Sequence, residues 1–350
     1  MPKFDHDALL QFAERLLFAG DFPKADSQIV ARLLVKADLS GYPGHGISRI
    51  PSYVSWIRNG TLNLKDKPKV VHEGKTTAVI DGNHYIGQIV ARMGIELAIA
   101  KAKEHGAGIV ALRRAGHIGR LADYMEMAAD QGMISIGTVS VGAGNTAPYG
   151  SMERATGTNP MAFGIPGKNG RHIILDFATS ATSMGELQKK LAKNEPIPPG
   201  MMLDGDGNPT TDYRVFQGPP RGVFLPFGGY KGSGVNLVTE ILGGIVSGHG
   251  LGKEWWNKGG HANNGVFLQA IAVKEFQPLD KFLAKVDELV SFIKSTRPAP
   301  GFEEILLPGE RGREIKSRQL KEGVEIDKAT WTHLIKLAGE LGVEGLVEEV

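Results

Sequence analysis

Apolar residues near the start of the chain recur with the period of an amphipathic helix. In DHDALLQFAERLLFAG, residues 5–20, leucine, phenylalanine and alanine return every three to four positions behind an aspartate, and a glycine closes the segment. KADSQIVARLLVKADLSG, residues 24–41, repeats the pattern, with Asp26 or Ser27 available to cap its start and Gly41 to end it. The pattern predicts two helices over residues 5–40.

From residue 69 to residue 178, short apolar runs alternate with longer amphipathic segments. KVVHEG and TTAVIDG predict two short paired strands, and residues 86–105 predict a long helix that ends at Gly106. The following predicted elements are a strand at 108–114, a helix at 119–132, a strand at 133–140, and two strands in NPMAFGIP and HIILDFA. The alternation over 86–140 predicts an α/β layer with some parallel pairing.

The second half of the chain is richer in glycine and proline. SMGELQKKLAKNE predicts a polar helix, and residues 197–212 predict a loop whose DGDGN stretch forms turns. Further predicted elements are a helix at 235–247, a strand at 265–273, and helices near 279–296, 310–322 and 328–341. We expect a central α/β lobe over residues 75–299, with residues 1–74 and 300–350 packed together as a helical lobe.

Composition narrows the function classes. Of 350 residues, 41% are apolar and 22% charged, and the net charge is +2, which gives no footprint for a nucleic-acid partner. The absence of cysteine excludes disulfides, thiolate metal sites and a cysteine nucleophile. No apolar run reaches the roughly 18 residues that a membrane span needs. The first residues lack a signal-peptide pattern, so a cytoplasmic enzyme is expected.

The stretch PGHGISRIPSY places three chemical groups at even spacing. His45 titrates near working pH and can give or take a proton, whereas Arg49 carries a permanent charge on a planar fork that suits a carboxylate. A continuous helix would put both on one face with Tyr53. Pro51 instead allows a helix that starts there after an extended lead-in. A histidine and an arginine at a helix start on the surface is the alternative interpretation.

Two further candidates lie at the ends of predicted strands. His117, in RRAGHIGRLADY, follows a strand and precedes a helix, where α/β proteins build ligand sites. Asp176 ends the strand in HIILDFATS, and a buried carboxylate there needs a partner such as a ribose hydroxyl, an amide or a histidine. The alternatives are that His117 caps its helix and that Asp176 caps the segment starting near Ser183.

Glycine-rich stretches offer an anion site but no standard nucleotide motif. In FGGYKGSGVNL, Gly232 and Gly234 expose amides at a helix start beside Lys231, which is typical of phosphate binding or of close helix packing. Lys231 precedes the glycines, so the stretch is no Walker A loop, and no G-x-G-x-x-G follows an early strand. No H-E-x-x-H or G-x-S-x-G occurs, and we predict no metal. The candidates fit hydride transfer between a nicotinamide and a carbonyl beside a carboxylate.

With these residues in view, the chain resembles the type-2 malate/L-lactate dehydrogenase (sulfolactate dehydrogenase-like) family, and within it the hydroxycarboxylate dehydrogenase branch. The matching stretches, in family order, are GHGISRIPSYVSWIRNG, GHIGRLADY, GTNPMAFGIP, LDFATS, EPIPPGMMLDGDGNPTTD, YKGSG and LPGE. The resemblance implies an α/β, mixed-sheet, non-Rossmann nicotinamide-binding fold with flanking helices. It also implies NAD or NADP as cofactor, and a homodimer in which both subunits build the site.

The resemblance also carries roles onto individual residues. His45 matches the proposed proton donor and His117 an alternative acid/base, while Arg49 matches the carboxylate-binding arginine and Tyr53 a substrate contact. The residues that match cofactor contacts are Ser140, Asn159, Ile174, Leu175, Asp176, Phe177, Ala178, Thr179, Tyr230, Lys231, Gly309, Glu310 and Arg311. Gly309–Arg311 lie in LPGERGREIKSR, which the residues alone would make a charged surface helix.

Two positions depart from the family pattern. Gly44 stands where the family has a serine before the histidine, and Thr138-Val139-Ser140 stands where the family has T-N-S. The expected activity is reduction of a small 2-oxo acid, or oxidation of its 2-hydroxy acid, of the malate or lactate type. The alternatives are reduction of a cyclic imine carboxylate and a non-redox relative that only binds carboxylates.

Overall fold

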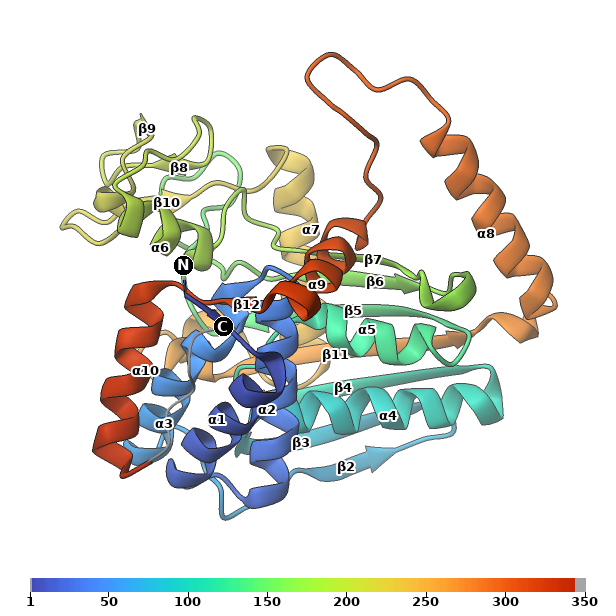
Figure 1. Ribbon diagram of the computed structural model, residues 1–350, viewed down its shortest axis with the longest axis horizontal. Helices are drawn as coiled ribbons and strands as arrows, with labels where there is room; N and C mark the ends of the chain where they lie inside the picture. Colours follow the sequence, from blue (N-terminus) through green and yellow to red (C-terminus); the bar gives the residue numbers. More distant parts are fainter. Residues whose placement is uncertain (1, 344–350) are drawn as a thin grey trace.

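The computed structural model describes residues 2–343 and builds them around a seven-stranded mixed sheet (Figure 1). The strand order is β2-β3-β4-β11-β5-β6-β7. The strands are β2 (Lys69–Glu73), β3 (Thr77–Tyr85), β4 (Ala107–Ala115), β11 (Asn264–Ala272), β5 (Met133–Val141), β6 (Met161–Ile165) and β7 (Ile173–Phe177). The predicted α/β mixed sheet is thus confirmed.

The sheet combines one parallel pair with antiparallel ones. Within the described residues, β3 and β4 pair in parallel across helix α4 (Gly87–His105), and the other neighbouring strands of this sheet run antiparallel. A parallel pair needs such a crossover, whereas adjacent antiparallel strands need only a turn. Strand β11 inserts between β4 and β5, so these two strands do not pair with each other. The predicted parallel pairing is confirmed for β3 and β4.

Helices cover both faces of the sheet because side chains alternate along each strand. On β5, Gly137 faces α5 (Leu121–Ala129), where an added Cβ would lie 3.0 Å from Leu121 Cδ2. Ser140 points to the opposite face and donates to Glu240 of α7 (Tyr230–Glu240) at 3.0 Å. A π-helical turn, Ile241–Val246, continues α7. The helix predicted at 235–247 therefore begins earlier, at Tyr230.

The two ends of the described chain lie together beside the sheet (Figure 1). The helices there are α1 (His6–Ala19), α2 (Lys24–Leu39), α3 (Ile50–Arg58) and α10 (Lys328–Leu341). Strand β1 (Lys3–Phe4) pairs antiparallel with β12 (Val324–Glu325), and the Phe4 and Trp331 ring centroids are 4.1 Å apart. Strand β2 belongs to the central sheet, although the predicted boundary assigns residues up to 74 to the terminal lobe.

A second, smaller core lies apart from the main one. It holds α6 (Met184–Lys193) and the three-stranded sheet β10-β8-β9, made of β10 (Val223–Phe224), β8 (Met202–Leu203) and β9 (Pro209–Thr210). Its buried side chains are Leu187, Ile197, Met202, Tyr213, Phe216 and Phe224. This small unit is attached through the segment around Ser183, which reaches the functional cavity described below.

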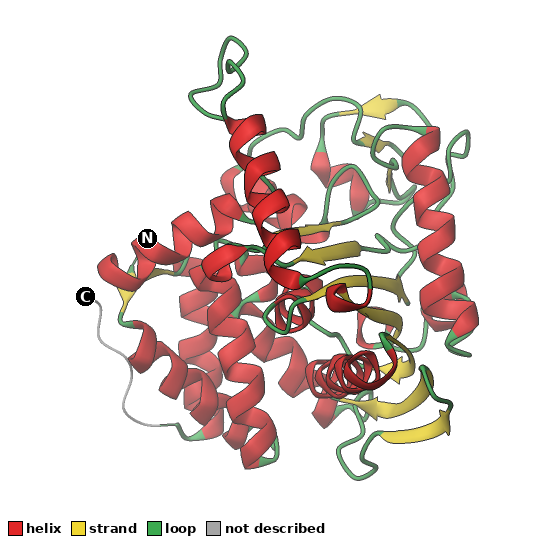
Figure 2. Cartoon of the chain, turned by 90° about the vertical axis from the view of Figure 1, so that its right-hand side faces the viewer, coloured by secondary structure: helices red, strands yellow, loops and turns green. Residues whose placement is uncertain are grey.

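Helices α8 (Leu279–Lys294) and α9 (Glu310–Glu322) complete the chain before α10. No side chain of α8 is buried, and in Figure 2 this helix faces the viewer with its following loop extending above the rest of the chain. No helix in the described range has the length and apolar character needed to cross a membrane.

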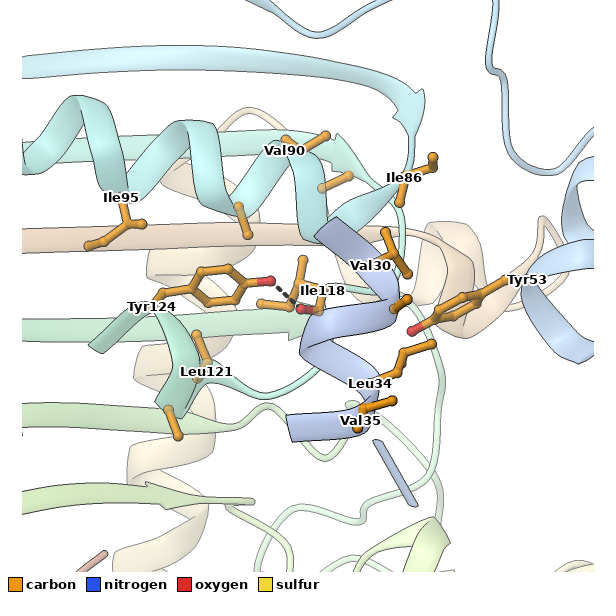
Figure 3. Packing of buried hydrophobic residues seen from close by; sticks show 14 of the residues in the cluster. Val30, Leu34, Val35, Tyr53, Ile86, Val90, Ile95, Ile118, Leu121 and Tyr124 are labelled. Carbon is orange, nitrogen blue, oxygen red and sulfur yellow. Dashed lines mark hydrogen bonds between the residues drawn. The ribbon is translucent and has the colours of Figure 1, made fainter. Parts of the chain in front are cut away.

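The main core supports the turn that carries His117. Figure 3 shows apolar side chains of α2 and α4 packed around Ile118, Leu121 and Tyr124. The Tyr124 hydroxyl donates to the carbonyl of Ile118, and the tyrosine is 1% exposed. A hydrogen bond inside a dry core holds its partners firmly. The turn after β4 is therefore anchored one residue beyond His117.

Candidate active site

His45, Arg49 and His117 meet at the wall of one cavity of about 250 Å³. The first two come from the loop before α3, and His117 comes from the turn between β4 and α5. The remaining lining residues are Tyr42, Ile118, Gly119, Arg120, Leu121, Val139, Val141, Thr158, Pro160, Asp176, Phe177, Ala178, Ser183, Met184, Gly185, His261 and Asn264. Residues from distant parts of the sequence thus converge around one space.

The His45 loop folds as two tight turns followed by a helix. Pro43–His45 and Ile47–Arg49 are 3-10 turns, and α3 begins at Ile50. Pro51 lies in the first turn of α3, where a missing N–H has no helical partner to lose. The three motif residues therefore do not share one continuous helix face. The expected helix start near Pro51 is confirmed, whereas the expected extended lead-in is wrong, because 3-10 turns precede the helix.

The buried carboxyl group of Asp38 holds the His45 loop through a hydrogen bond to the loop backbone. Asp38 Oδ2 accepts the Ile47 N–H at 2.8 Å. A Cβ on Gly46 would lie 2.0 Å from Asp38 Oδ1, so only glycine fits there. Burial raises the pKa of Asp38 to about 8, and Asp327 contributes in the same direction. Asp38 therefore supports the loop mainly as a neutral acid at neutral pH.

Arg49 brings a charge to the cavity without a carboxylate to balance it. Its Nε donates to the carbonyl of Gly44 at 2.6 Å, and no ion pair joins it to a carboxylate within residues 2–343. Arg120, the other guanidinium at this wall, is paired with Asp123 at 2.7 Å. Burial lowers the pKa of Arg49, but an arginine stays protonated in proteins. The terminal nitrogens of Arg49 are therefore available to an anionic ligand.

Three imidazoles surround this charge and are neutral. The rings of His45 and His117 stack with centroids 5.8 Å apart and planes at 17°. Burial, followed by the charge of Arg49, lowers the pKa of His45 to about 3, that of His261 to about 4, and that of His117 well below its ordinary value. Each neutral ring offers one N–H donor and one acceptor nitrogen.

Tyr53 contacts His117 and not the cavity. Its hydroxyl lies 2.7 Å from His117 Nδ1 and accepts the Gln88 Nε2–H at 2.7 Å. The side chain is 2% exposed and does not line the cavity wall. The predicted substrate contact of Tyr53 remains a prediction, and in the structure its hydroxyl is engaged with an imidazole.

Asp176 lies at the end of β7 and caps a helix from outside its own segment. Its Oδ2 accepts the N–H of Ala122 at 2.9 Å, in the first turn of α5. Burial raises the pKa of Asp176 to about 6, against the hydrogen bond from Ala122 and the charge of Arg120. The alternative that Asp176 caps the segment near Ser183 is wrong, because its oxygen is bound to α5, while the Ser183 hydroxyl accepts the Glu186 N–H of α6.

A second cavity of about 500 Å³ adjoins the first. The two share Tyr42, Arg120 and Asp176 in their walls. Among the predicted cofactor contacts, Ile174, Leu175, Asp176, Gly309 and Arg311 line the second cavity. The Ile174 N–H donates to the carbonyl of Pro308 at 3.2 Å, which joins the start of β7 to the loop before α9. Phe177 and Ala178 line the first cavity.

The other predicted cofactor contacts lie outside these walls. Ser140 and Asn159 are fully buried and both donate to Glu240, while the Thr179 hydroxyl donates to the carbonyls of Thr158 and Asn159. The Glu310 carboxylate is bound by the Leu307 N–H and by Lys294. Tyr230 is 65% exposed at the start of α7, next to Lys231. Within this single chain, these side chains do not face the space around His45.

Several wall residues were not predicted as site residues, among them Arg120, Val139 and His261. Arg120 lies in the quoted GHIGR stretch and would have been found by asking which cation follows His117. Val139 occupies the position where the family pattern has asparagine, and its side chain lines the cavity. His261 gave no signal, because it lies in a 3-10 turn after two glycines with positive φ, Gly259 and Gly260.

Gly44, the first departure from the family pattern, directly faces a glycine of the small unit. A Cβ on Gly44 would lie 3.3 Å from the Cα of Gly185, at the start of α6. Two glycines thus allow the small unit to approach the His45 loop closely. The serine of the family pattern would press on this contact.

Comparison with known proteins decides the family. The family model described as malate/L-lactate dehydrogenase matches residues 4–335. This chain belongs to the malate/L-lactate dehydrogenase family. Among its relatives, a malate dehydrogenase of Pyrococcus horikoshii is 38% identical over 349 residues, covering 97% of this chain and 96% of that protein. An L-sulfolactate dehydrogenase of Methanocaldococcus jannaschii is 40% identical over 327 residues, covering 92% of each.

Further similar proteins and solved structures carry both the same and other substrates in their names. Hydroxycarboxylate dehydrogenase B of Escherichia coli is 32% identical over 346 residues, covering 97% of this chain and 95% of that protein. The solved structure of the Pyrococcus horikoshii malate dehydrogenase matches with a TM-score of 0.90 at 36% identity, covering 98% and 97% of the chains. A delta1-piperideine-2-carboxylate reductase from Pseudomonas syringae matches with a TM-score of 0.84 at 28% identity, covering 97% and 100%.

Proposed function

We propose that this chain is a NAD(P)-dependent oxidoreductase that interconverts a small 2-oxo acid and its 2-hydroxy acid, of the malate or lactate type. The observation that carries the proposal is Arg49, a guanidinium with free terminal nitrogens and no carboxylate partner in the described chain, beside neutral imidazoles in one cavity. A desolvated charge without a partner is costly and is retained where a ligand supplies the partner. Relatives named for acids that carry a carboxylate support the same reading.

The two adjoining cavities fit a nicotinamide dinucleotide. The first, between His117 and Val139, would take the nicotinamide end, and the second, beside Ile174 and Arg311, would take the adenosine end. Asp176 and Arg120, which line both, would contact the centre of the molecule. The bound dinucleotide would supply or accept the hydride.

The chain's own residues would bind and orient the acid. Arg49 would hold its carboxylate through the two terminal nitrogens, because its Nε is already bound to Gly44. The carbonyl oxygen would then lie near the imidazoles of His45 and His117, whose rings are 5.8 Å apart. A fixed substrate geometry of this kind lowers the entropic part of the barrier.

His45 would deliver the proton. It lines the first cavity and also a neighbouring one of about 290 Å³ that contains Arg311, whereas His117 lines only the first of these two. His45 can therefore exchange protons through the neighbouring space. A carboxylate bound to Arg49 would offset one cause of the lowered His45 pKa and move that pKa towards its ordinary range.

A panel of acids with both reduced cofactors tests this function. The protein is mixed with NADH or NADPH and with the 2-oxo acids that correspond to malate, lactate and sulfolactate, and nicotinamide absorbance is followed. We expect the reduced nicotinamide to be oxidised in the presence of at least one 2-oxo acid. Both cofactors are needed because the second cavity presents the cations Arg311 and Lys316 as well as the carboxylates Glu126 and Asp130.

One alternative substrate class enters the same panel. The structural likeness to a delta1-piperideine-2-carboxylate reductase favours a cyclic imine carboxylate, which would offer Arg49 the same anionic group. If the protein reduces the imine but none of the 2-oxo acids, a cyclic imine carboxylate replaces the 2-oxo acid as the proposed substrate. Acid binding without nicotinamide oxidation in any pair would refute the redox function and favour a carboxylate-binding protein.

We also infer a homodimer that uses the exposed face of α7. Leu237, Val238, Ile241, Ile245 and Val246 on α7 and its π-helical continuation are 39% to 59% exposed. Apolar residues gathered in this way on one helix are typical of an interface. The predicted cofactor contacts Tyr230 and Lys231 lie at the start of the same helix, so in a dimer they are the candidates for what one subunit contributes to its partner.

A further inference from the structure

A chain of three side chains leads from the core to the cavity. Gln88 of α4 donates from Nε2 to the Tyr53 hydroxyl at 2.7 Å, and that hydroxyl lies 2.7 Å from His117 Nδ1. Gln88 and Tyr53 are 1% and 2% exposed, whereas His117 lines the cavity. The chain of hydrogen bonds therefore starts in a dry region and ends on a ring that a substrate can touch.

The direction of these hydrogen bonds fixes where the ring hydrogen of His117 lies. A phenol has one hydrogen, and within the described residues the Tyr53 hydroxyl has two partners: Gln88, which donates to it, and His117 Nδ1, which is thereby the acceptor available for that hydrogen. A neutral imidazole that accepts at Nδ1 carries its hydrogen on Nε2. The pKa of His117 is lowered well below its ordinary value by burial and by the charged or titratable groups that face it, Arg49, His45 and His261.

We propose that Gln88, through Tyr53, is a positioning residue that holds His117 as the neutral tautomer with an N–H directed at the substrate. This inference rests on the proposed function only for what that N–H does: it would donate to the carbonyl oxygen of the 2-oxo acid. A fixed donor at that oxygen stabilises the negative charge that develops during hydride addition. His117 then polarises the carbonyl, and Gln88 and Tyr53 determine that it can.

Tyr124, in the same core, has a buried hydroxyl that is bound to a backbone carbonyl and not to an imidazole. Figure 3 shows Tyr124 and Tyr53 on opposite sides of Ile118, with the Tyr124 hydroxyl bound to the Ile118 carbonyl. Both phenols are buried, and both hold the turn that carries His117. Only the Tyr53 hydroxyl touches the His117 ring. Tyr124→Phe is therefore the matched control, because it removes a buried hydroxyl from this turn without touching the ring.

The test reverses the direction of these hydrogen bonds by replacing Gln88 with glutamate, which has nearly the same shape. In Gln88→Glu, measured at a pH high enough to ionise the buried carboxyl, the carboxylate cannot donate, so it accepts the Tyr53 hydrogen, and the phenol oxygen then accepts from Nδ1–H. The hydrogen on Nε2 is lost. Nitrogen-15 NMR of histidine-labelled protein, with His117 assigned by His117→Gln, should show the ring change from the Nε2–H to the Nδ1–H tautomer. This readout needs no substrate.

Kinetics provide the second readout. Loss of one donor at a developing oxyanion should lower kcat for 2-oxo acid reduction about 10²-fold with little change in KM. Protonation of the new carboxyl restores a donor to Tyr53, so both the wild-type tautomer and kcat should recover as pH falls. A merely structural defect would not recover in this way. Tyr124→Phe should keep the wild-type tautomer and pH profile, whatever stability it loses.

Failure of this inference and failure of the proposed function would give different experimental results. A His117 ring that stays Nε2–H both in Gln88→Glu up to the highest pH at which the protein is folded and in Gln88→Met, or the Nδ1–H tautomer already present in the wild type, overturns the positioning role. An inactive wild type with every acid overturns the proposed function, and the NMR result still decides the tautomer. Should Gln88→Glu not fold, Gln88→Met removes the donor without a charge and should mix the two tautomers. An unmixed Nε2–H ring in that variant overturns the inference.

Discussion

Replacing Arg49 with glutamine removes the charge that, in our account, holds the substrate carboxylate. The Arg49 Nε is bound to the Gly44 carbonyl at 2.6 Å, so two terminal nitrogens remain for the two carboxylate oxygens. A hydrogen bond to a charged group contributes about 1.5–3 kcal/mol, and two give about 3–6 kcal/mol. Since about 1.4 kcal/mol corresponds to a factor of ten, Arg49→Gln should lower kcat/KM about 10²–10⁴-fold.

The assay separates carboxylate binding from general damage to the site. Steady-state reduction of a 2-oxo acid and of its uncharged amide is compared in the wild type, Arg49→Gln and Arg49→Lys. In Arg49→Gln, kcat/KM for the acid should fall far more than kcat/KM for the amide, because the amide has no charge to pair with the guanidinium. Arg49→Lys should lie between, since it keeps the charge but not the fork. A loss below tenfold for the acid, or equal losses for acid and amide, would refute the assignment.

Three further substitutions test the supporting structure. The pKa of Asp38 is about 8 in the folded protein, against an ordinary 3.8, so the wild type should lose stability as pH rises from about 4 to 8. Over that pH range, the melting temperature of Asp38→Asn should fall less than that of the wild type. Gly44→Ser places an atom 3.3 Å from Gly185, so we expect a destabilisation of about 1–3 kcal/mol and a lower melting temperature; an unchanged melting temperature would show that the small unit yields freely. Ile245→Glu puts a charge on the exposed α7 face, and sedimentation should show a shift from dimer to monomer; a dimer as tight as the wild type would exclude this interface.

Local patterns predicted the elements and part of the site. The spacing of apolar residues placed α1, α2, α4 and the strands of the seven-stranded sheet, because each buries one face against a neighbour, but residues 197–212, predicted as a loop, also contain the short strands β8 and β9. His117 and Asp176 were found at strand ends, where the chain leaves the sheet beside a ligand cavity. His45 and Arg49 were found because glycines and a cation stood together within a few residues.

The rest depends on contacts between distant segments. The insertion of β11 between β4 and β5 is decided by long-range pairing that no local period reveals. The partner of Tyr53 follows from two 3-10 turns that rotate α3 relative to His45, and a helical spacing rule missed them. His261 reaches the cavity on a glycine-rich turn whose direction is set by tertiary packing.

A crystal structure with the reduced cofactor and oxamate, an unreactive analogue of a 2-oxo acid, tests the central claim most directly. We expect the oxamate carboxylate on the terminal nitrogens of Arg49, its carbonyl oxygen at His117 Nε2, and the dinucleotide extending past Asp176 towards Arg311. Oxamate bound away from Arg49, or a cofactor outside both cavities, would contradict that claim.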